Sequence, residues 1–160
     1  MKIIKAPEPF EPSTVDLFMS GSIEQGSAPD WQTKLAADLD DVEGIALNPR
    51  RDAWDASWEQ SVDFGPFREQ VEWELLGLIS ARVVAVYFAS GTRAPITLLE
   101  LGISCVQNSA VVFCASDFWR RGNVETTCRF FGLPVYCDNY QGWLSAIRLA
   151  LAMRKLGRER

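Results

Sequence analysis

The fold is decided by residues 83–115, VVAVYFASGTRAPITLLELGISCVQNSAVVFCA, in which two short apolar runs enclose a longer apolar segment. The runs at 83–88 and 110–115 have the length and continuous hydrophobicity of parallel strands that are buried on both faces. The segment at 95–106 begins with proline and is long enough for about three helical turns. A strand, a crossover helix and a second strand predict a parallel β-sheet covered by helices.

The same alternation continues in both directions along the chain. Hydrophobic spacing predicts strands at 14–19, 44–48, 83–88, 110–115 and 133–136, and helices at 30–39, 67–79, 95–106, 123–130 and 142–156. We therefore expect one α/β domain over residues 14–160, a three-layer sandwich around a five-stranded parallel sheet. Residues 1–13 contain three prolines and are expected to form an extended lead-in before this domain. The helix at 67–79 is expected to show one face marked by Val71, Leu75 and Leu78.

The composition excludes several classes of function. The 160 residues contain no histidine, so neither a Ser-His-Asp triad nor a Cys-His pair is available. A formal net charge of −5 gives no overall basic field for polymeric nucleic acid. The four cysteines form no CxxC pair, and the GxGxxG and GxxxxGK[ST] motifs are missing, so we expect no metal and no cofactor. With no membrane-spanning apolar run and no recognisable signal peptide, the sequence predicts a cytoplasmic protein.

Glu100 is the only ionisable residue in the otherwise apolar helix at 95–106. Burial of an unpaired carboxylate costs roughly several kcal/mol, so Glu100 is expected to have a functional or structural role that offsets this cost. Because Glu100 lies in the second turn, the helix dipole is expected to favour its ionised form, which suits a nucleophile or a partner for a developing cation. A capping or salt-bridge role with Arg93 or Arg82 explains the residue equally well, and the two interpretations stay open.

Three segments leave the carboxyl ends of predicted strands, at 20–26, 48–66 and 90–95. Ligands of open parallel sheets bind at this edge, where the strand order reverses, so we expect the three segments to converge there. They contain the candidate binding residues Asn48, Gly91 and Thr92.

The segment at 49–66 has no helical or strand periodicity, and loops of this length inside compact domains are usually functional or disordered. Because it contains Trp54 and Trp58, we expect an ordered loop that belongs to the site, with aromatic rings able to stack on a base. Arg50 and Arg51 could hold a phosphate through paired hydrogen bonds, or serve as surface salt-bridge partners.

Five sequence blocks together resemble the nucleoside 2-deoxyribosyltransferase-like family: FMSGSI at 18–23, NPRRDAWD at 48–55, EQVEWE at 69–74, LLELG at 98–102 and FWRRGNV at 118–124. The resemblance covers residues from about 15 to about 130. It implies a flavodoxin-like fold, an oligomer of at least two chains, and chemistry at the N-glycosidic bond of a nucleoside or nucleotide.

The resemblance also implies roles for individual residues. The glutamate of the ELG motif attacks the anomeric carbon in that family, and it corresponds to Glu100. The loop that lines the pocket corresponds to Gly21, Ser22 and Ile23. The asparagine of the GNV-like motif reaches the sugar in the neighbouring chain's site, and it corresponds to Asn123.

The chain departs from the family pattern at three places. Arg82 stands at the place assigned to an aspartate that handles the proton of the base, Phe18 replaces a common tyrosine, and residues 90–94 replace an acidic or glycine-rich run. The proton donor therefore does not carry over from the family. The candidates in this chain are Asp52 and Asp55, whose alternative role is to tie down a turn.

These observations favour an enzyme that cleaves or exchanges the base of a (deoxy)nucleoside or its 5′-monophosphate through a glycosyl-Glu100 intermediate. The alternative, motivated by Arg82, is a non-catalytic nucleotide-binding or sensing module. A third and weaker option is a purely structural partner protein. The helix at 95–106 is apolar on every side, so we also expect a homodimer or a larger homo-oligomer.

Overall fold

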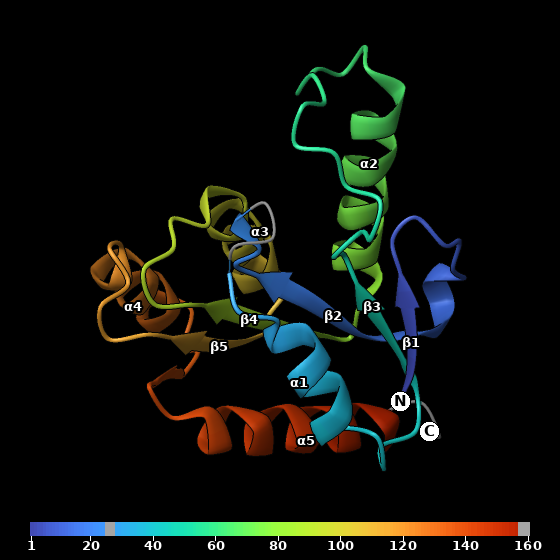
Figure 1. Cartoon of the computed structure of the whole chain (residues 1–160). Helices are drawn as coiled ribbons and strands as arrows, with labels where there is room; N and C mark the ends of the chain where they lie inside the picture. Colours follow the sequence, from blue (N-terminus) through green and yellow to red (C-terminus); the bar gives the residue numbers. More distant parts are fainter. Residues whose placement is uncertain (25–27, 157–160) are drawn as a thin grey trace.

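The computed structural model describes residues 1–24 and 28–156 and shows a six-stranded parallel sheet between two layers of helices (Figure 1). The strands are β1 (Lys2–Lys5), β2 (Val15–Gly21), β3 (Ile45–Asn48), β4 (Val83–Phe88), β5 (Ala110–Cys114) and β6 (Val135–Cys137). The helices are α1 (Trp31–Asp38), α2 (Gly65–Ser80), α3 (Pro95–Val106), α4 (Arg121–Phe130) and α5 (Tyr140–Leu156), and a 3-10 turn, η1 (Pro12–Thr14), precedes β2. The predicted α/β three-layer architecture is confirmed.

The strand order is β1-β3-β2-β4-β5-β6. Without β1, this is the flavodoxin-like order, in which the first strand of the domain lies between the second and the third. The chain leaves β2 toward β3 on one side and reaches β4 on the other side. The order therefore reverses between β2 and β4, and a ligand site is expected at the carboxyl ends of these two strands.

The predicted count of five strands is wrong by one, because residues 2–5 pair in parallel with β3. The first residues of the expected lead-in therefore form the edge strand of the sheet. Ile4 is buried in the core beneath α2, so this short strand is held by packing as well as by hydrogen bonds.

Two separate hydrophobic cores cover the two faces of the sheet. Helices α1 and α5 pack on one face, where the rings of Trp31, Tyr87 and Phe113 stack on one another with centroid separations of 4.9 and 4.4 Å. Helices α2, α3 and α4 pack on the other face (Figure 1). None of the described helices combines the length and the hydrophobicity that crossing a membrane requires.

Helix α2 presents a different face to the sheet from the one expected. Its buried residues are Gln70, Trp73, Gly77 and Leu78, whereas Leu75 is exposed. Gly77 permits a close approach of helix and sheet: a β-carbon at this position would lie 2.8 Å from Leu47 Cδ1 and 3.0 Å from the ring of Phe18. The helix therefore lies directly over β2 and β3.

Helix α3 is buried only in part. Thr97, Glu100, Leu101, Ser104 and Cys105 face the interior, whereas Ile96, Leu99 and Val106 are exposed. The single chain therefore leaves one apolar side of α3 uncovered, and the homo-oligomer expected from this helix stays a prediction.

The segment between β3 and α2, together with the first turns of α2, projects from the body of the molecule (Figure 1). We call residues 50–64 the arm. Its aromatic side chains pack on one another, with ring centroids 5.1 Å apart for Trp54 and Trp58 and 6.1 Å apart for Trp58 and Phe64. The arm has no helix or strand of its own, as predicted, and α2 begins at Gly65, where Pro66 occupies the first turn.

Candidate functional site

Glu100 lies on the inner side of α3 and points to the carboxyl end of β2. Its Oε2 accepts a hydrogen bond of 2.7 Å from the hydroxyl of Ser20, the penultimate residue of β2. Glu100 is 7% exposed, and none of the described basic side chains forms an ion pair with it. The carboxyl group is therefore held by a neutral donor, and the expected alternative of an arginine salt bridge is wrong.

Glu74 is a second carboxyl group at this place, and the sequence analysis did not identify it. Its Oε1 accepts a hydrogen bond of 2.9 Å from Nε2 of Gln70, one helical turn earlier in α2. The same Nε2 donates to the carbonyl of Pro49 at 2.8 Å, so the residue that follows β3 fixes the orientation of the amide. The amide in turn holds Glu74 in place.

The packing of α2 on the sheet brings Glu74 level with Ser20. Gly77 contacts Phe18, and Glu74 lies about 4.5 Å nearer the start of α2. Ser20 lies on the same face as Phe18, about 6.6 Å nearer the carboxyl end of β2. Because α2 runs opposite to the strands, the two displacements have the same direction, and Glu74 faces the region where Ser20 binds Glu100.

Burial dominates the acid–base properties of this carboxyl pair. It raises the pKa of Glu100 to about 8, and the charge of Glu74 adds to this rise, whereas the hydrogen bond from Ser20 opposes it. Burial likewise raises the pKa of Glu74, against the hydrogen bond from Gln70. The expectation that the helix dipole keeps Glu100 ionised is therefore wrong for the free protein. At neutral pH the pair retains a proton, because two like charges cannot share this buried space cheaply.

Sequence reasoning missed Glu74 because it assigned the apolar face of the helix to Leu75. Glu72, on a different face of the same helix, lies 3.8 Å from Arg68 and is exposed. The available signal was the spacing of Gln70, Glu74 and Gly77 at i, i+4 and i+7, which places polar and small residues on one face.

Ser22 and Thr92 meet at the ends of β2 and β4, as the expected convergence of loops requires. Their hydroxyl oxygens are 2.7 Å apart, and both side chains also bond to the backbone of Ala89. Gly21 is surrounded by protein, since a β-carbon there would lie 2.5 Å from the ring of Trp31. These residues fix the shape of the site, and their contacts in this structure are with the chain itself.

The other binding candidates lie around this edge. Ile23 is half-buried, and Gly91 is exposed with a φ of +69°, in the left-handed region that favours glycine. Asn48 is buried at the end of β3, and its Oδ1 accepts a hydrogen bond of 2.9 Å from the backbone N–H of Arg50. Asn48 thereby starts the turn into the arm.

The structure does not bring Asp52 or Asp55 into contact with the carboxyl pair. Asp52 is exposed and forms an ion pair with Lys5 of the edge strand β1. Asp55 accepts hydrogen bonds from the backbone and hydroxyl of Ser57, which lower the pKa of its carboxyl group. Both contacts match the alternative role in which aspartates tie down a turn.

The arginines of the arm bind neighbouring parts of the chain, and Arg50 donates a hydrogen bond of 3.3 Å to the carbonyl of Ala28. Arg51 forms a 2.8 Å ion pair with Glu69, and its guanidinium lies 5.1 Å from the ring centroid of Trp58. Trp54 is half-buried against Trp58. Nε of Arg50 is buried and has no hydrogen-bond partner among the described residues.

Arg82 lies at the amino ends of the strands, whereas Glu100 lies at their carboxyl ends. It precedes β4 and forms a 3.0 Å ion pair with Asp16 near the start of β2. The replacement noted in the sequence therefore puts no cation beside the carboxyl pair.

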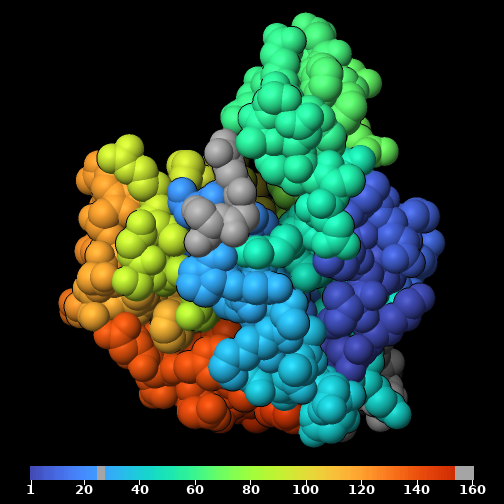
Figure 2. Space-filling view, in the orientation of Figure 1, coloured from blue at the N-terminus to red at the C-terminus, as the bar shows by residue number. Residues whose placement is uncertain are grey.

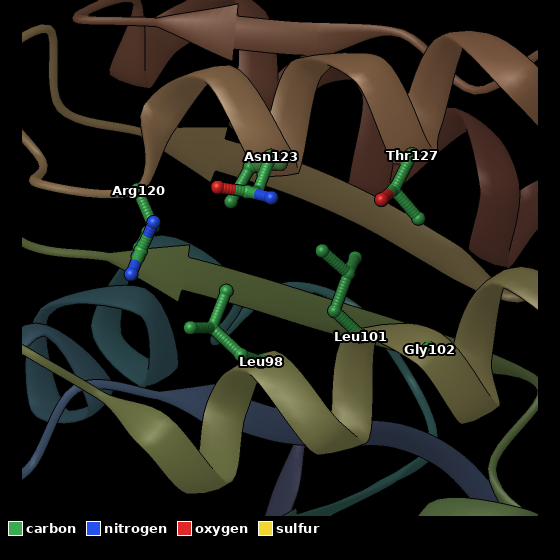
Figure 3. A pocket seen from close by; sticks show the side chains of 7 residues that line it. Leu98, Leu101, Gly102, Arg120, Asn123 and Thr127 are labelled. Carbon is green, nitrogen blue, oxygen red and sulfur yellow. The ribbon is translucent and has the colours of Figure 1, made fainter.

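Asn123 lines a groove of about 320 Å³ between α3 and α4 (Figure 3). The groove is lined by Leu98, Leu101, Gly102, Arg120, Asn123, Val124 and Thr127. Glu100 does not line it, so Asn123 and Glu100 of one chain face different sides of α3. An asparagine in this position is available to a neighbouring molecule, which is what the family resemblance implies.

Several buried polar atoms around the site lack hydrogen-bond partners among the residues that the structure describes. They are Oε1 of Gln70, both side-chain polar atoms of Gln32, and Nε of both Arg50 and Arg51. Gln70 and Arg50 flank the end of β3, and Gln32 lies in the first turn of α1. Buried polar groups normally have partners, so these atoms indicate a place for water or ligand. In the described ranges, no group of three His, Cys, Asp or Glu side chains is arranged to hold a metal ion.

The fold and the site define an α/β protein with a flavodoxin-like sheet whose candidate chemistry rests on carboxyl groups. A family model described as nucleoside 2-deoxyribosyltransferase like matches residues 14–118, and the chain belongs to this family. A comparison with curated proteins finds no match.

Proposed function

We propose that this chain cleaves or exchanges the N-glycosidic bond of a (deoxy)nucleoside or nucleoside 5′-monophosphate, with Glu100 as nucleophile and Glu74 as acid. The observation that carries the proposal is the buried Glu100, bonded to Ser20 at the point where the strand order reverses, with the half-buried Glu74 close enough for its charge to raise the pKa of Glu100. Family membership supports the class of reaction. Retaining glycoside cleavage requires two carboxyl groups of this kind and no histidine.

In the first half-reaction, Glu100 attacks the anomeric carbon and forms a C–O bond as the C–N bond to the base breaks. The proton held by Glu74 passes to the departing base, which leaves neutral. In the second half-reaction, water or another base attacks the same carbon, the bond to Glu100 breaks, and the proton of the acceptor returns to Glu74.

The location of the proton follows from the charge that the sugar develops. Positive charge at the anomeric carbon stabilises the ionised form of the nearer carboxyl group, and the hydrogen bond from Ser20 favours the same form. The proton shared by the pair is thereby directed to Glu74. Asp52 and Asp55 are less suited to this role: Asp52 is exposed and paired with Lys5, and hydrogen bonds from Ser57 lower the pKa of the Asp55 carboxyl group, which disfavours its protonated form.

Three finer expectations accompany the proposal. The exposed side of α3 and the location of Asn123 support a homo-oligomer in which a neighbouring chain completes the site. The unpartnered Nε of Arg50 supports recognition of a 5′-phosphate. The cytoplasmic location stays a prediction.

The test is a panel of nucleosides and nucleoside 5′-monophosphates, incubated with and without an acceptor base and followed by chromatography of free base. Wild-type protein should release or exchange a base, and Glu100→Gln should abolish this. Mass spectrometry of quenched reactions should show a sugar adduct on the peptide that contains Glu100. Full activity of Glu100→Gln would refute the mechanism.

The acid role of Glu74 has its own test. Glu74→Gln should lower kcat by roughly 10²–10⁴-fold on ordinary nucleosides, the usual contribution of a general acid. A 7-methylguanine nucleoside carries a positively charged base that needs no proton to leave, so its cleavage should largely survive. Glu72→Gln, an exposed position on the same helix, is the matched control. Equal loss on both substrates would indicate that Glu74 only positions other groups.

Thermal stabilisation by a nucleotide that is never consumed would instead identify a sensing module. The motivation for this alternative is that Arg82 stands in place of the aspartate that the family resemblance implies, and Arg82 is paired with Asp16 away from Glu100.

A further inference from the structure

The arm ends in an exposed surface around Val62 that carries two acidic side chains, and Arg68 of α2 donates a hydrogen bond of 3.1 Å to the carbonyl of Val62. Val62 is 68% exposed, and Glu59 and Asp63 beside it are exposed as well. Neither acid forms an ion pair with a described residue. A single exposed valine is ordinary at a protein surface, so a contact at the arm is indicated by the charges beside Val62 and by the groove between α3 and α4.

The groove between α3 and α4 has the complementary character. Its floor is formed by Leu98 and Leu101, and Arg120 stands at one end (Figure 3). The guanidinium of Arg120 lies 4.4 Å from the ring centroid of Trp119, and that of Arg93 lies 5.5 Å from it. Neither arginine forms an ion pair in the described part of the chain. The groove is thus apolar inside and basic at its end.

The shape of the molecule separates these two surfaces. The arm and the start of α2 rise from one side, and the space beside them, above α3 and α4, is open (Figure 1, Figure 2). One arm cannot fold down onto its own groove without unwinding α2, because the helix fixes its base. Two copies related by a two-fold axis can each place an arm in the space that the other leaves open.

We propose that the arm of one copy docks into the α3/α4 groove of a second copy, with Val62 over the apolar floor and the acids around it facing Arg120 and Arg93. The inference rests on the self-association proposed above and is independent of the chemistry of Glu100. In a two-fold dimer the contact occurs twice.

Two features favour a second copy as the occupant. The charges match, because a chain of net charge −5 places Arg120 and Arg93, which form no ion pair with described residues, at or beside this groove, and places Glu59 and Asp63 on its own arm. The apolar surface also continues, because the exposed Leu99 and Val106 of α3 lie three and four positions from the groove-lining Gly102, on the same side of the helix. A dimer formed in this way brings the arm of one chain, with Trp54 and Trp58, toward the helix that carries the partner's Glu100.

The first test is a photocrosslink in the purified protein. Val62 is replaced by p-benzoylphenylalanine, the sample is irradiated, and the products are separated and digested for mass spectrometry. We expect a covalent dimer in which position 62 is joined to a peptide from residues 95–130. Placement of the same crosslinker at Leu149, an exposed position on α5, should give no dimer.

The second test uses analytical ultracentrifugation to measure how charge reversal at the groove changes the dimer dissociation constant. Arg120→Glu should raise the dimer dissociation constant by about tenfold or more, because like charges then face each other across two contacts. Arg129→Glu, an exposed arginine on the same helix that does not line the groove, should leave the constant unchanged. Combining Arg120→Glu with Asp63→Arg should restore association.

A monomer at micromolar concentration, or crosslinks that map outside residues 95–130, would overturn the proposal. Both tests need no substrate and are repeated on the Glu100→Gln variant. Loss of glycosidic activity with intact docking, or loss of docking with intact chemistry, therefore identifies which of the two proposals fails.

Discussion

Replacement of Glu100 by glutamine should make the protein more stable at alkaline pH than the wild type. In the folded protein, burial raises the pKa of Glu100 from its ordinary value of 4.5 to about 8. Between these two values the folded state keeps a proton that the unfolded state has released. Stability therefore falls as pH rises through this window, by linkage.

The magnitude follows from the two pKa values. Each pKa unit corresponds to about 1.4 kcal/mol, so the cost of Glu100 reaches at most about 5 kcal/mol above pH 8 and vanishes below pH 4.5. Glutamine has the shape of the protonated acid and can still accept the hydrogen bond from Ser20. The variant should match the wild type near pH 4.5 and exceed it by several kcal/mol, up to about this ceiling, at pH 8.5.

Urea denaturation followed by circular dichroism, at half-unit steps from pH 4.5 to pH 9, measures this difference. Glu72→Gln removes an exposed carboxylate that is paired with Arg68 and should change stability by less than about 1 kcal/mol across the range. If the curves of wild type and Glu100→Gln stay parallel over the whole range, Glu100 is not a buried acid with a raised pKa, and the reasoning about the carboxyl pair is refuted.

Other substitutions test the surroundings of the pair. Ser20→Ala removes the donor that lowers the pKa of Glu100, so the acidic limb of the pH–rate profile should move to higher pH and kcat at pH 7 should fall by about tenfold; an unmoved limb would contradict this. Gly21→Ala should cost roughly 1–3 kcal/mol in urea denaturation because its β-carbon would overlap an indole ring, whereas Gly91→Ala, strained at φ +69° but free of contacts, should cost about 1 kcal/mol. Gln70→Leu leaves the carbonyl of Pro49 and the carboxyl group of Glu74 without their donor, so the free energy of unfolding should fall by about 1–3 kcal/mol and most activity should be lost. Unchanged stability and activity would show that the amide does not hold Glu74 in place.

Much of the fold could be predicted because its central elements carry strong patterns. The apolar runs that became β4 and β5 and the helix that became α3 were recognised by hydrophobicity alone. Residues 2–5 were missed because four residues between the start of the chain and a proline-rich stretch give no detectable period. Their strand exists because β3 offers an open edge, which is a property of the assembled sheet.

The site was predicted in part, and the missing part has a physical cause. Glu100 could be found because a charge in an apolar helix is conspicuous. Glu74 could not, because the inner face of α2 is built from polar and small residues, and Leu75 suggested a different inner face. A helix that covers a site need not be apolar toward the sheet, so hydrophobic periodicity selects the wrong side in such cases.

The extra strand β1 also decides where this sheet stops. Without it, β3 would offer an open row of backbone donors and acceptors beside the arm, ready to pair with the same strand of another molecule. β1 pairs with this edge of β3 and becomes the edge strand instead. It has four residues, KIIK, with a lysine at each end, and a proline-rich turn follows it. Short edge strands with charged residues and nearby prolines resist edge-to-edge aggregation, so deletion of β1 should make the protein aggregate more readily.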